Sequence, residues 1–252
     1  MDFIEVNKEN KKTILLIHPL GFTAEAMKNL IADKLPSDYR YIIPELAGHG
    51  KSKEVFKSTE IEAKKIENYL LEKGIREIDL ALGASLGGLV LLNLLNSKKI
   101  KFNKCIFEAC SLSEGSKIKE ILARKFVMDK QKKALKDRKF ALDEIEKFYG
   151  KQWSNIIADT LIGMDKKSVT NLVKTFVYAK VPKLSKADQE KCIFCYGSEE
   201  FNLKDSKKIL EKKLPKVKVK IWKGYNHCEI IAKDNLKYCK FLEGEIWSQE
   251  LK

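Results

Sequence analysis

The stretch of sequence that decides the fold is Leu80-Ala81-Leu82-Gly83-Ala84-Ser85-Leu86-Gly87-Gly88-Leu89-Val90. An apolar run leads directly into a G-x-S-x-G pattern at Gly83, Ser85 and Gly87, and a second apolar run follows it. This pattern predicts a strand that turns sharply into a helix, with small residues around the serine to avoid clashes across the turn. The turn holds the Ser85 hydroxyl at a helix N-terminus, where the helix dipole favours developing negative charge. We interpret Ser85 as a candidate nucleophile rather than part of a turn that only serves packing.

Apolar runs and helical patterns alternate on both sides of this stretch. Continuous apolar runs, which suit strands covered on both faces, occur at 13–18, 41–44 and 78–82, and further strands are expected at 104–108, 192–196 and 217–222. Helical patterns at 24–35, 59–74 and 86–95 lie between the earlier runs. In the second of these patterns, Thr59 and Glu62 have the spacing of a capping box, and Ile61 falls on the apolar stripe. The alternation predicts an α/β fold with a mostly parallel central sheet flanked by helices.

The alternation stops between residues 111 and 182. Only helical patterns occur there, with apolar residues such as Ile118, Ile121, Leu122 and Phe126 at helical spacing. The sequence therefore predicts a core formed by 1–110 and 183–252, interrupted by a helical cap at 111–182. Aromatic residues and Met are frequent in this insertion, and they suit either helix packing or a lid over an acyl pocket.

The charge balance bears on the partners that the protein can have. The 252-residue chain carries a formal charge of +14, but its basic residues are 45 lysines and only four arginines. Arginine dominates the recognition of bases and phosphates, so we interpret the excess as a solvated lysine-rich surface and expect no nucleic-acid partner. Residues 117–139 include ten basic residues and only three acidic ones. They suggest a solvated helix face, or alternatively attraction of an anionic substrate.

Cysteine usage and the apolar runs bear on the location of the protein. No apolar run is long enough to span a membrane, and the first residues lack the apolar core of a signal peptide. The six cysteines lie mostly within apolar runs, which favours reduced, buried thiols in a cytoplasmic protein. Cys192 and Cys195 form a C-x-x-C pattern, but on a strand they point to opposite faces, so we expect core thiols rather than a metal or redox site.

Three further segments resemble the α/β-hydrolase family, in the order that the family has them. Residues 15–22, Leu-Leu-Ile-His-Pro-Leu-Gly-Phe, look like its His-Gly oxyanion loop; residues 45–52, Glu-Leu-Ala-Gly-His-Gly-Lys-Ser, are similar to its D-x-x-G-H-G-x-S turn; residues 224–227, Gly-Tyr-Asn-His, look like its catalytic histidine loop. Pro19 stands where the family usually has glycine, and Glu45 stands where it usually has aspartate. The resemblance covers essentially the whole chain and implies the α/β-hydrolase fold.

The resemblance also implies how Ser85 is activated. A serine hydroxyl needs a base, and the position after the last strand assigns that role to His227. The other two histidines, His18 and His49, are better explained as structural or loop-orienting residues. Matching positions in the family imply that the backbone N–H groups of Leu20 and Leu86 form the oxyanion hole.

The acid that orients the histidine is expected in the loop after the strand at 192–196. In the family a carboxylate three residues after Gly197 has this role, and that position is Glu200, where aspartate is more common. Its neighbour Glu199 is an alternative. Glu108, at the end of the strand at 104–108, is a third candidate, because some relatives carry the acid at the end of that strand.

The function expected from these residues is that of a serine hydrolase. It would cleave a carboxylic ester or a related small acyl substrate through a Ser-His-Glu triad and an acyl-enzyme, with no cofactor and no metal. A C–C bond hydrolase or lyase of the same fold acting on an anionic substrate is the alternative, as is a non-catalytic ligand-binding protein. The sequence predicts no oligomeric state.

Overall fold

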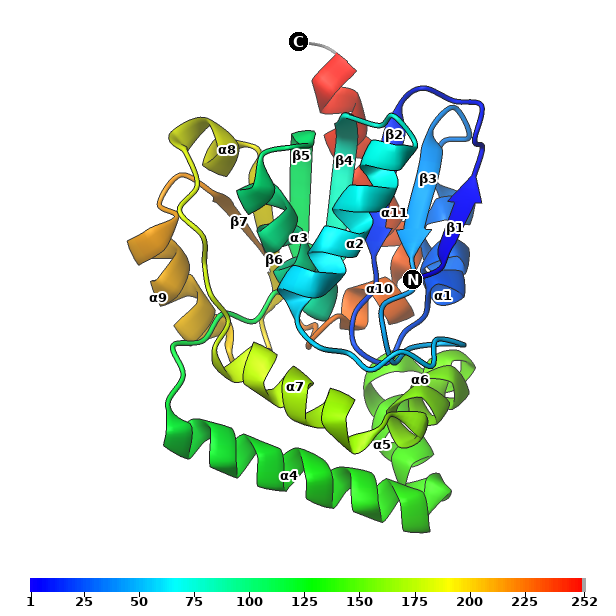
Figure 1. Cartoon of the computed structure of the whole chain (residues 1–252), viewed down its shortest axis with the longest axis vertical. Helices are drawn as coiled ribbons and strands as arrows, with labels where there is room; N and C mark the ends of the chain where they lie inside the picture. The colour runs from blue at the N-terminus through cyan, green and yellow to red at the C-terminus, as the bar shows by residue number, and fades with distance from the viewer. Residues whose placement is uncertain (251–252) are drawn as a thin grey trace.

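The computed structural model describes residues 1–250 and contains a seven-stranded sheet covered by helices on both faces (Figure 1). The strand order is β1-β3-β2-β4-β5-β6-β7, and every neighbouring pair is parallel except β1 with β3. The strands are β1 (Phe3–Val6), β2 (Thr13–Ile17), β3 (Arg40–Pro44), β4 (Glu77–Ala84), β5 (Lys101–Glu108), β6 (Cys192–Gly197) and β7 (Lys218–Trp222). The predicted α/β architecture and mostly parallel sheet are confirmed.

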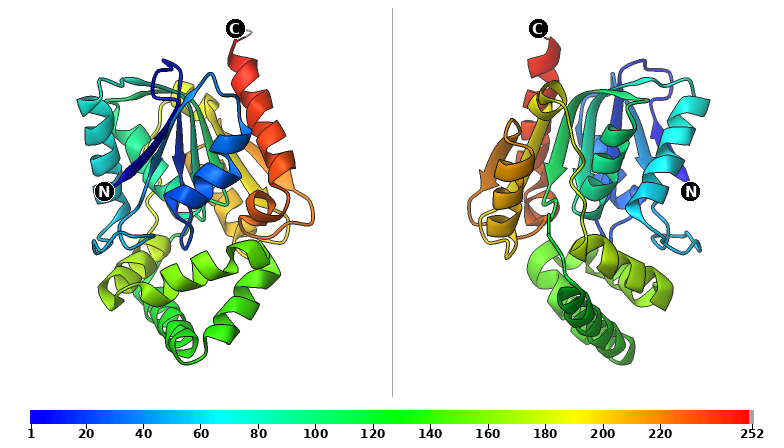
Figure 2. Two further views of the ribbon diagram at one scale, coloured as in Figure 1. Left: turned by 90° about the vertical axis from the view of Figure 1, so that its right-hand side faces the viewer. Right: turned by 60° about the vertical axis from the view of Figure 1, so that its left-hand side comes forward.

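Helices cover the two faces of the sheet in separate groups (Figure 2). One face packs against α1 (Ala24–Leu30), α10 (Glu229–Lys233) and α11 (Asn235–Glu250), and the opposite face packs against α2 (Thr59–Glu72), α3 (Leu86–Ser97) and α9 (Leu203–Lys213). Two short elements, η1 (Ala32–Lys34) and α8 (Lys186–Glu190), complete this part of the chain. Both faces of the central strands are therefore buried, which explains why β2 is apolar at every position after Thr13.

The edge strand β1 was not predicted from the sequence. It pairs antiparallel with β3, with Phe3 opposite Pro44 and Val6 opposite Tyr41. All four of its residues are only half-buried, so its sequence does not form the continuous apolar run of a central strand.

The start of α2 differs from the predicted capping box. Its N-cap is Ser58, whose side chain accepts a hydrogen bond from the Ile61 N–H. Glu62 is instead buried and accepts a hydrogen bond of 2.9 Å from the N–H of Ala47, and Ile61 is 40% exposed rather than part of the buried stripe. A tertiary contact thus takes the carboxylate that the local spacing assigned to the cap.

The segment between β5 and β6 carries four helices that lie beyond the carboxyl ends of the parallel strands (Figures 1 and 2). They are α4 (Lys117–Lys136), α5 (Arg138–Tyr149), α6 (Lys151–Gly163) and α7 (Lys166–Val177), here called the cap helices. Helix α4 lies outermost and contains no buried residue. Its residues Ile118, Ile121, Leu122 and Phe126, although spaced as a helical stripe, are 57–71% exposed.

The cysteines occupy the interior on both sides of the sheet. All six are free and buried. Cys192 belongs to the apolar cluster on the α2 and α3 face, and Cys195 belongs to the cluster on the opposite face, as expected for positions i and i+3 of a strand. In residues 1–250 no helix is both long enough and apolar enough to cross a membrane.

Candidate active site

Ser85 occupies the sharp turn between β4 and α3. Its backbone has φ +47° and ψ −107°, outside the regions that a serine prefers, and its side chain is buried with 5% exposure. A Cβ on Gly83 would meet the backbone of Gly87, and a Cβ on Gly87 would overlap the carbonyl oxygen of Ile17 in β2. The glycines of the G-x-S-x-G pattern are therefore required by close backbone approach, and β2 packs against the first turn of α3.

Ser85, His227 and Glu200 lie in one hydrogen-bonded row. The Oγ of Ser85 is 2.8 Å from Nε2 of His227, and Nδ1 of His227 is 3.0 Å from Oε2 of Glu200. The serine follows β4, the glutamate follows β6 and the histidine follows β7, so all three sit at the carboxyl ends of parallel strands. Glu200 is 5% exposed, which shields its interaction with the imidazole from solvent.

Gly197 positions both the acid and the histidine loop, a role that the sequence analysis did not assign to it. Its N–H donates a hydrogen bond of 2.8 Å to Oε1 of Glu200, leaving Oε2 for His227. A Cβ on Gly197 would overlap the carbonyl oxygen of Tyr225, so only glycine allows the histidine loop to pass this close. A glycine at the end of a buried strand, just before the acid, is the signal that could have indicated this contact.

The other two carboxylates considered for the acid lie elsewhere. Glu199 is exposed and its carboxylate accepts a hydrogen bond of 2.9 Å from the hydroxyl of Ser198. Glu108 is fully buried and accepts a hydrogen bond of 3.0 Å from Nε1 of Trp222. Of the three candidates, Glu200 is the one whose carboxylate the structure brings to His227.

The two backbone groups expected to form an oxyanion hole are the N–H of Leu20, which follows β2, and the N–H of Leu86, which begins α3. Leu86 is the first residue of α3, so its N–H has no acceptor within the helix. Leu20 follows Pro19, whose carbonyl accepts from the N–H of Phe22 in a tight turn. Within residues 1–250, neither the N–H of Leu20 nor that of Leu86 donates to a protein acceptor. Both donors are therefore available to a ligand.

His18 and His49 lie buried beside this loop, with ring centroids 4.9 Å apart. His18 accepts from the N–H of Leu46 through Nε2 at 3.1 Å, and its Nδ1 lies 2.9 Å from the Pro19 carbonyl. Burial, together with the neighbouring His18, lowers the pKa of His49 to about 3, so His49 is neutral. The carboxylate of Glu45 accepts a hydrogen bond of 3.3 Å from the N–H of Ala24. These contacts hold the loop that carries Leu20.

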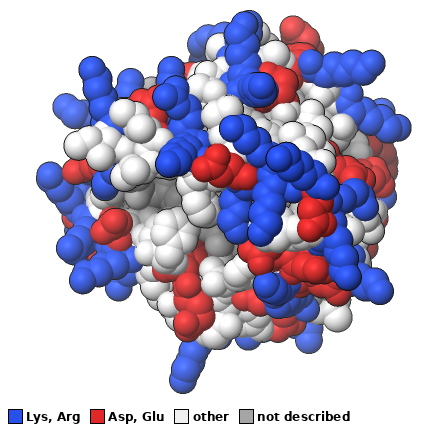
Figure 3. Space-filling model, turned by 90° about the horizontal axis from the view of Figure 1, so that it is seen from below, with Lys and Arg blue, Asp and Glu red and all other residues white. Residues whose placement is uncertain are grey.

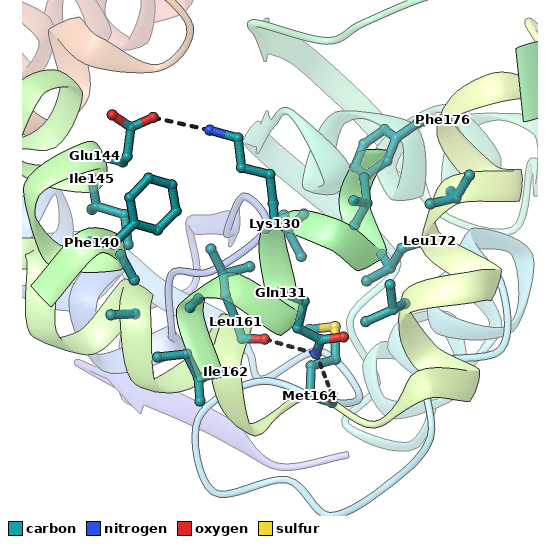
Figure 4. A pocket seen from close by; sticks show the side chains of 17 residues that line it. Lys130, Gln131, Phe140, Glu144, Ile145, Leu161, Ile162, Met164, Leu172 and Phe176 are labelled. Carbon is teal, nitrogen blue, oxygen red and sulfur yellow. Dashed lines mark hydrogen bonds and ion pairs between the residues drawn. The ribbon is translucent and has the colours of Figure 1, made fainter. Parts of the chain in front are cut away.

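A cavity of about 220 Å³ lies among the four cap helices (Figure 4). Its wall is almost entirely apolar and includes Leu20 from the loop after β2, but none of Ser85, His227 and Glu200. The polar groups at its edge are already paired, because Lys130 forms an ion pair of 3.1 Å with Glu144 and the side-chain amide of Gln131 donates to the carbonyls of Leu161 and Met164. The cavity is suited to an uncharged, apolar group.

Metal ligands are not grouped in the described part of the chain: no three His, Cys, Asp or Glu side chains there are arranged to hold an ion. The expectation that the protein uses no metal or cofactor stays a prediction.

Comparison with known proteins relates the whole chain to one fold. The chain matches no protein-family model and no curated protein sequence. Among solved structures it is similar to an α/β hydrolase family protein from Desulfitobacterium hafniense, with TM-score 0.70 and 17% identity over 96% of this chain and 99% of that one. It is similar to an esterase from Exiguobacterium antarcticum, with TM-score 0.74 and 12% identity over 97% and 94% of the two chains. It is also similar to MenH from S. aureus, with TM-score 0.71 and 15% identity over 99% and 98%. Because TM-scores of 0.70 and 0.74 extend over nearly the whole of both chains, the chain has the α/β-hydrolase fold.

Proposed function

We propose that the protein is a serine hydrolase that cleaves a carboxylic ester or a related small acyl substrate. The observation that carries the proposal is the row of hydrogen bonds from Ser85 through His227 to Glu200, with lengths of 2.8 and 3.0 Å. This is the arrangement in which a base removes the proton of a serine hydroxyl and an acid holds the base in the required tautomer. The esterases and other hydrolases with the same fold support the general class of reaction.

The geometry suits acyl transfer in two halves. Ser85 Oγ attacks the carbonyl carbon of the substrate while Nε2 of His227 takes the hydroxyl proton, and the carboxylate of Glu200 stabilises the resulting imidazolium. The N–H groups of Leu20 and Leu86 bind the oxyanion of the tetrahedral intermediate. His227 then gives its proton to the departing alkoxide, leaving an acyl-enzyme. A water molecule repeats the attack with His227 as base, which releases the carboxylic acid and restores Ser85.

The acyl chain would enter the cavity of the cap helices. A cavity of about 150 Å³ accommodates benzene, so about 220 Å³ suits an acyl group of roughly six to ten carbons. Leu20 carries a proposed oxyanion donor on its backbone and lines this cavity with its side chain, so the carbonyl and its chain would be bound by adjacent parts of one residue. We therefore expect medium-chain esters to be better substrates than acetyl esters.

The two alternative functions make different demands on the site. A C–C bond hydrolase or lyase acting on an anionic substrate requires a free cation at the cavity, but Lys130, which lines the cavity, is paired with Glu144. A non-catalytic ligand-binding protein could retain the same three residues but would not turn over. The cytoplasmic location indicated by the buried, free cysteines is part of the proposal.

A fluorophosphonate probe and a series of p-nitrophenyl esters test the proposal. The wild type should be labelled and should hydrolyse the esters, whereas Ser85→Ala should do neither. The matched control is Ser97→Ala at the other end of the same helix, which should be labelled like the wild type. Labelling without turnover of any ester would favour the lyase or ligand-binding alternatives, and turnover by Ser85→Ala well above background would overturn the assignment of the nucleophile.

A further inference from the structure

The outer face of helix α4 combines exposed apolar side chains with lysines. Ile118, Ile121, Leu122 and Phe126 are 71, 57, 63 and 64% exposed, although side chains of this size are normally buried. At about 100° per residue they fall within an arc of roughly 140° on one side of the helix. Four neighbouring large apolar residues on one helix face form a patch of the kind that marks an interaction surface.

The same face becomes basic in the second half of the helix. Lys132 and Lys136 continue the arc that the apolar residues begin, Lys125 lies within it, and Asp129 is the one acidic residue of this arc. Over its whole length, α4 has eight basic and two acidic residues. The molecular surface seen from this side carries many Lys and Arg side chains beside uncharged areas (Figure 3). The face is therefore both apolar and strongly positive.

The opposite face of α4 serves the cavity. Val127, Lys130, Gln131 and Ala134 line the cavity and project from the other side of the helix. Helix α4 packs on the other cap helices and is the outermost element at this end of the molecule (Figure 1). The packing of the cap thus accounts for the inner face of α4, and nothing in the described structure covers its outer face.

We propose that the outer face of α4 docks the protein on the surface of an anionic lipid bilayer. Apolar side chains set among lysines, on a helix exposed along its length, are the pattern of helices that lie in a membrane interface, where the apolar residues enter the headgroup region and the lysines pair with anionic lipids. A second copy of the chain fits less well, because an identical helix with two acidic residues offers few partners for eight basic ones. The proposal concerns binding and does not depend on the proposed esterase activity.

Vesicle flotation tests the proposal directly on the full-length chain. The wild type should float with vesicles of phosphatidylcholine and phosphatidylglycerol, and binding should weaken as salt rises. It should bind vesicles of phosphatidylcholine alone far less. Absence of flotation with the anionic vesicles at low salt, or equal binding to both kinds of vesicle, would overturn the proposal.

Variants separate the two contributions. Leu122→Ser/Phe126→Ser should reduce the partition coefficient more than about tenfold by removing the inserted groups. Lys125→Gln/Lys132→Gln/Lys136→Gln should reduce it roughly 100-fold, since each lysine near an anionic surface contributes about fivefold. The matched control is Trp247→Ser, an exposed apolar residue (55%) near the C-terminal end of α11. Figure 1 shows this end of α11 at the side of the molecule opposite the cap helices. The binding of this control variant should equal that of the wild type.

Two further measurements test whether a second copy of the chain covers the outer face of α4, and whether vesicle binding is independent of the proposed esterase activity. Sedimentation should give the same mass for the wild type and for Leu122→Ser/Phe126→Ser; a dimer that this variant dissociates would show that a second copy covers the face and would overturn the proposal. Ser85→Ala should float like the wild type, so a failed esterase assay leaves the membrane result readable. Loss of flotation in Ser85→Ala would contradict binding through α4.

Discussion

Nε1 of Trp222 donates a hydrogen bond of 3.0 Å to Oε2 of Glu108, joining the ends of β7 and β5 in the interior of the protein. Burial, with a smaller contribution from the nearby carboxylate of Glu200, raises the pKa of Glu108 from 4.5 to about 8. Glu108 is therefore a neutral carboxylic acid at pH 7, a short distance behind the proposed catalytic row.

This raised pKa predicts a specific pH dependence of stability. Between pH 4.5 and about 8 the folded protein holds the Glu108 proton and the unfolded chain releases it, so the free energy of unfolding should fall by at most about 1.4 kcal/mol per pH unit as pH rises. Glu108→Gln keeps the acceptor for Trp222 and removes the titration. Urea denaturation between pH 5 and 8 should give a flatter profile for this variant, whereas Glu199→Gln, at an exposed site, should follow the wild type. Equal slopes in all three proteins would refute the prediction.

The choice of acid can be tested with three parallel substitutions. Glu200→Gln should fold normally and lose turnover by about 10⁴-fold, by analogy with the triad aspartate of serine proteases, because the amide cannot stabilise the imidazolium of His227. Glu199→Gln and Glu108→Gln should retain turnover within a few-fold. The measurement is kcat/KM on one p-nitrophenyl ester. Near-wild-type turnover in Glu200→Gln with collapse of either neighbour would make the assignment wrong.

Gly197→Ala should displace the histidine loop. The added methyl group overlaps the Tyr225 carbonyl, and a shift of about 1 Å at His227 is enough to cost on the order of 100-fold in rate. The control is Gly244→Ala in α11, where a Cβ meets nothing within 4 Å and should stabilise the helix by up to ~1 kcal/mol. Thermal unfolding monitors the fold, and kcat/KM monitors the site. Unchanged activity in Gly197→Ala would show that the loop tolerates the shift.

Val173→Phe should shorten the acyl chain that the enzyme accepts. Val173 is buried at 4% exposure and lines the cavity, so a larger side chain there takes up cavity volume. We expect kcat/KM on an octanoyl ester to fall at least about tenfold while the acetyl ester is little affected. Ile156→Phe, at a 38% exposed position of the same cap, serves as control. A parallel loss on both esters would indicate that the cavity does not hold the chain.

Features that neighbouring residues encode could be predicted from the sequence, whereas contacts between distant parts of the chain could not. The turn at Ser85 is encoded by neighbouring residues, so its strand, its strained serine and its helix could be predicted from the eleven residues 80–90. The distance between Ser85 and His227 could not, since 142 positions of chain separate them and only the parallel sheet brings their loops to one edge. The pairing of Ser85 with His227 was expected from the resemblance to a family, because hydrophobic periodicity contains no information on which loops meet.

The features that the sequence did not predict correctly also have physical explanations. Glu62 has the spacing of a cap, but a buried N–H at Ala47 binds it. Periodicity places Ile118 and Phe126 on one helix face and contains no information on whether a neighbour covers that face. Strand β1 has only four residues, and Glu5 interrupts its apolar residues, so it does not form a continuous apolar run.

The chain leaves the sheet at the end of β5 for the cap helices and re-enters it at β6, and these two strands are direct neighbours, with Cys105 opposite Cys192. No strand pairing therefore depends on what lies between them. Recombination or protein engineering can therefore exchange the intervening helices for those of another protein while Ser85, His227 and Glu200 stay in place. Such an exchange would replace the cavity and the exposed face of α4 together, so the proposed acyl preference and the proposed membrane binding would change as one unit.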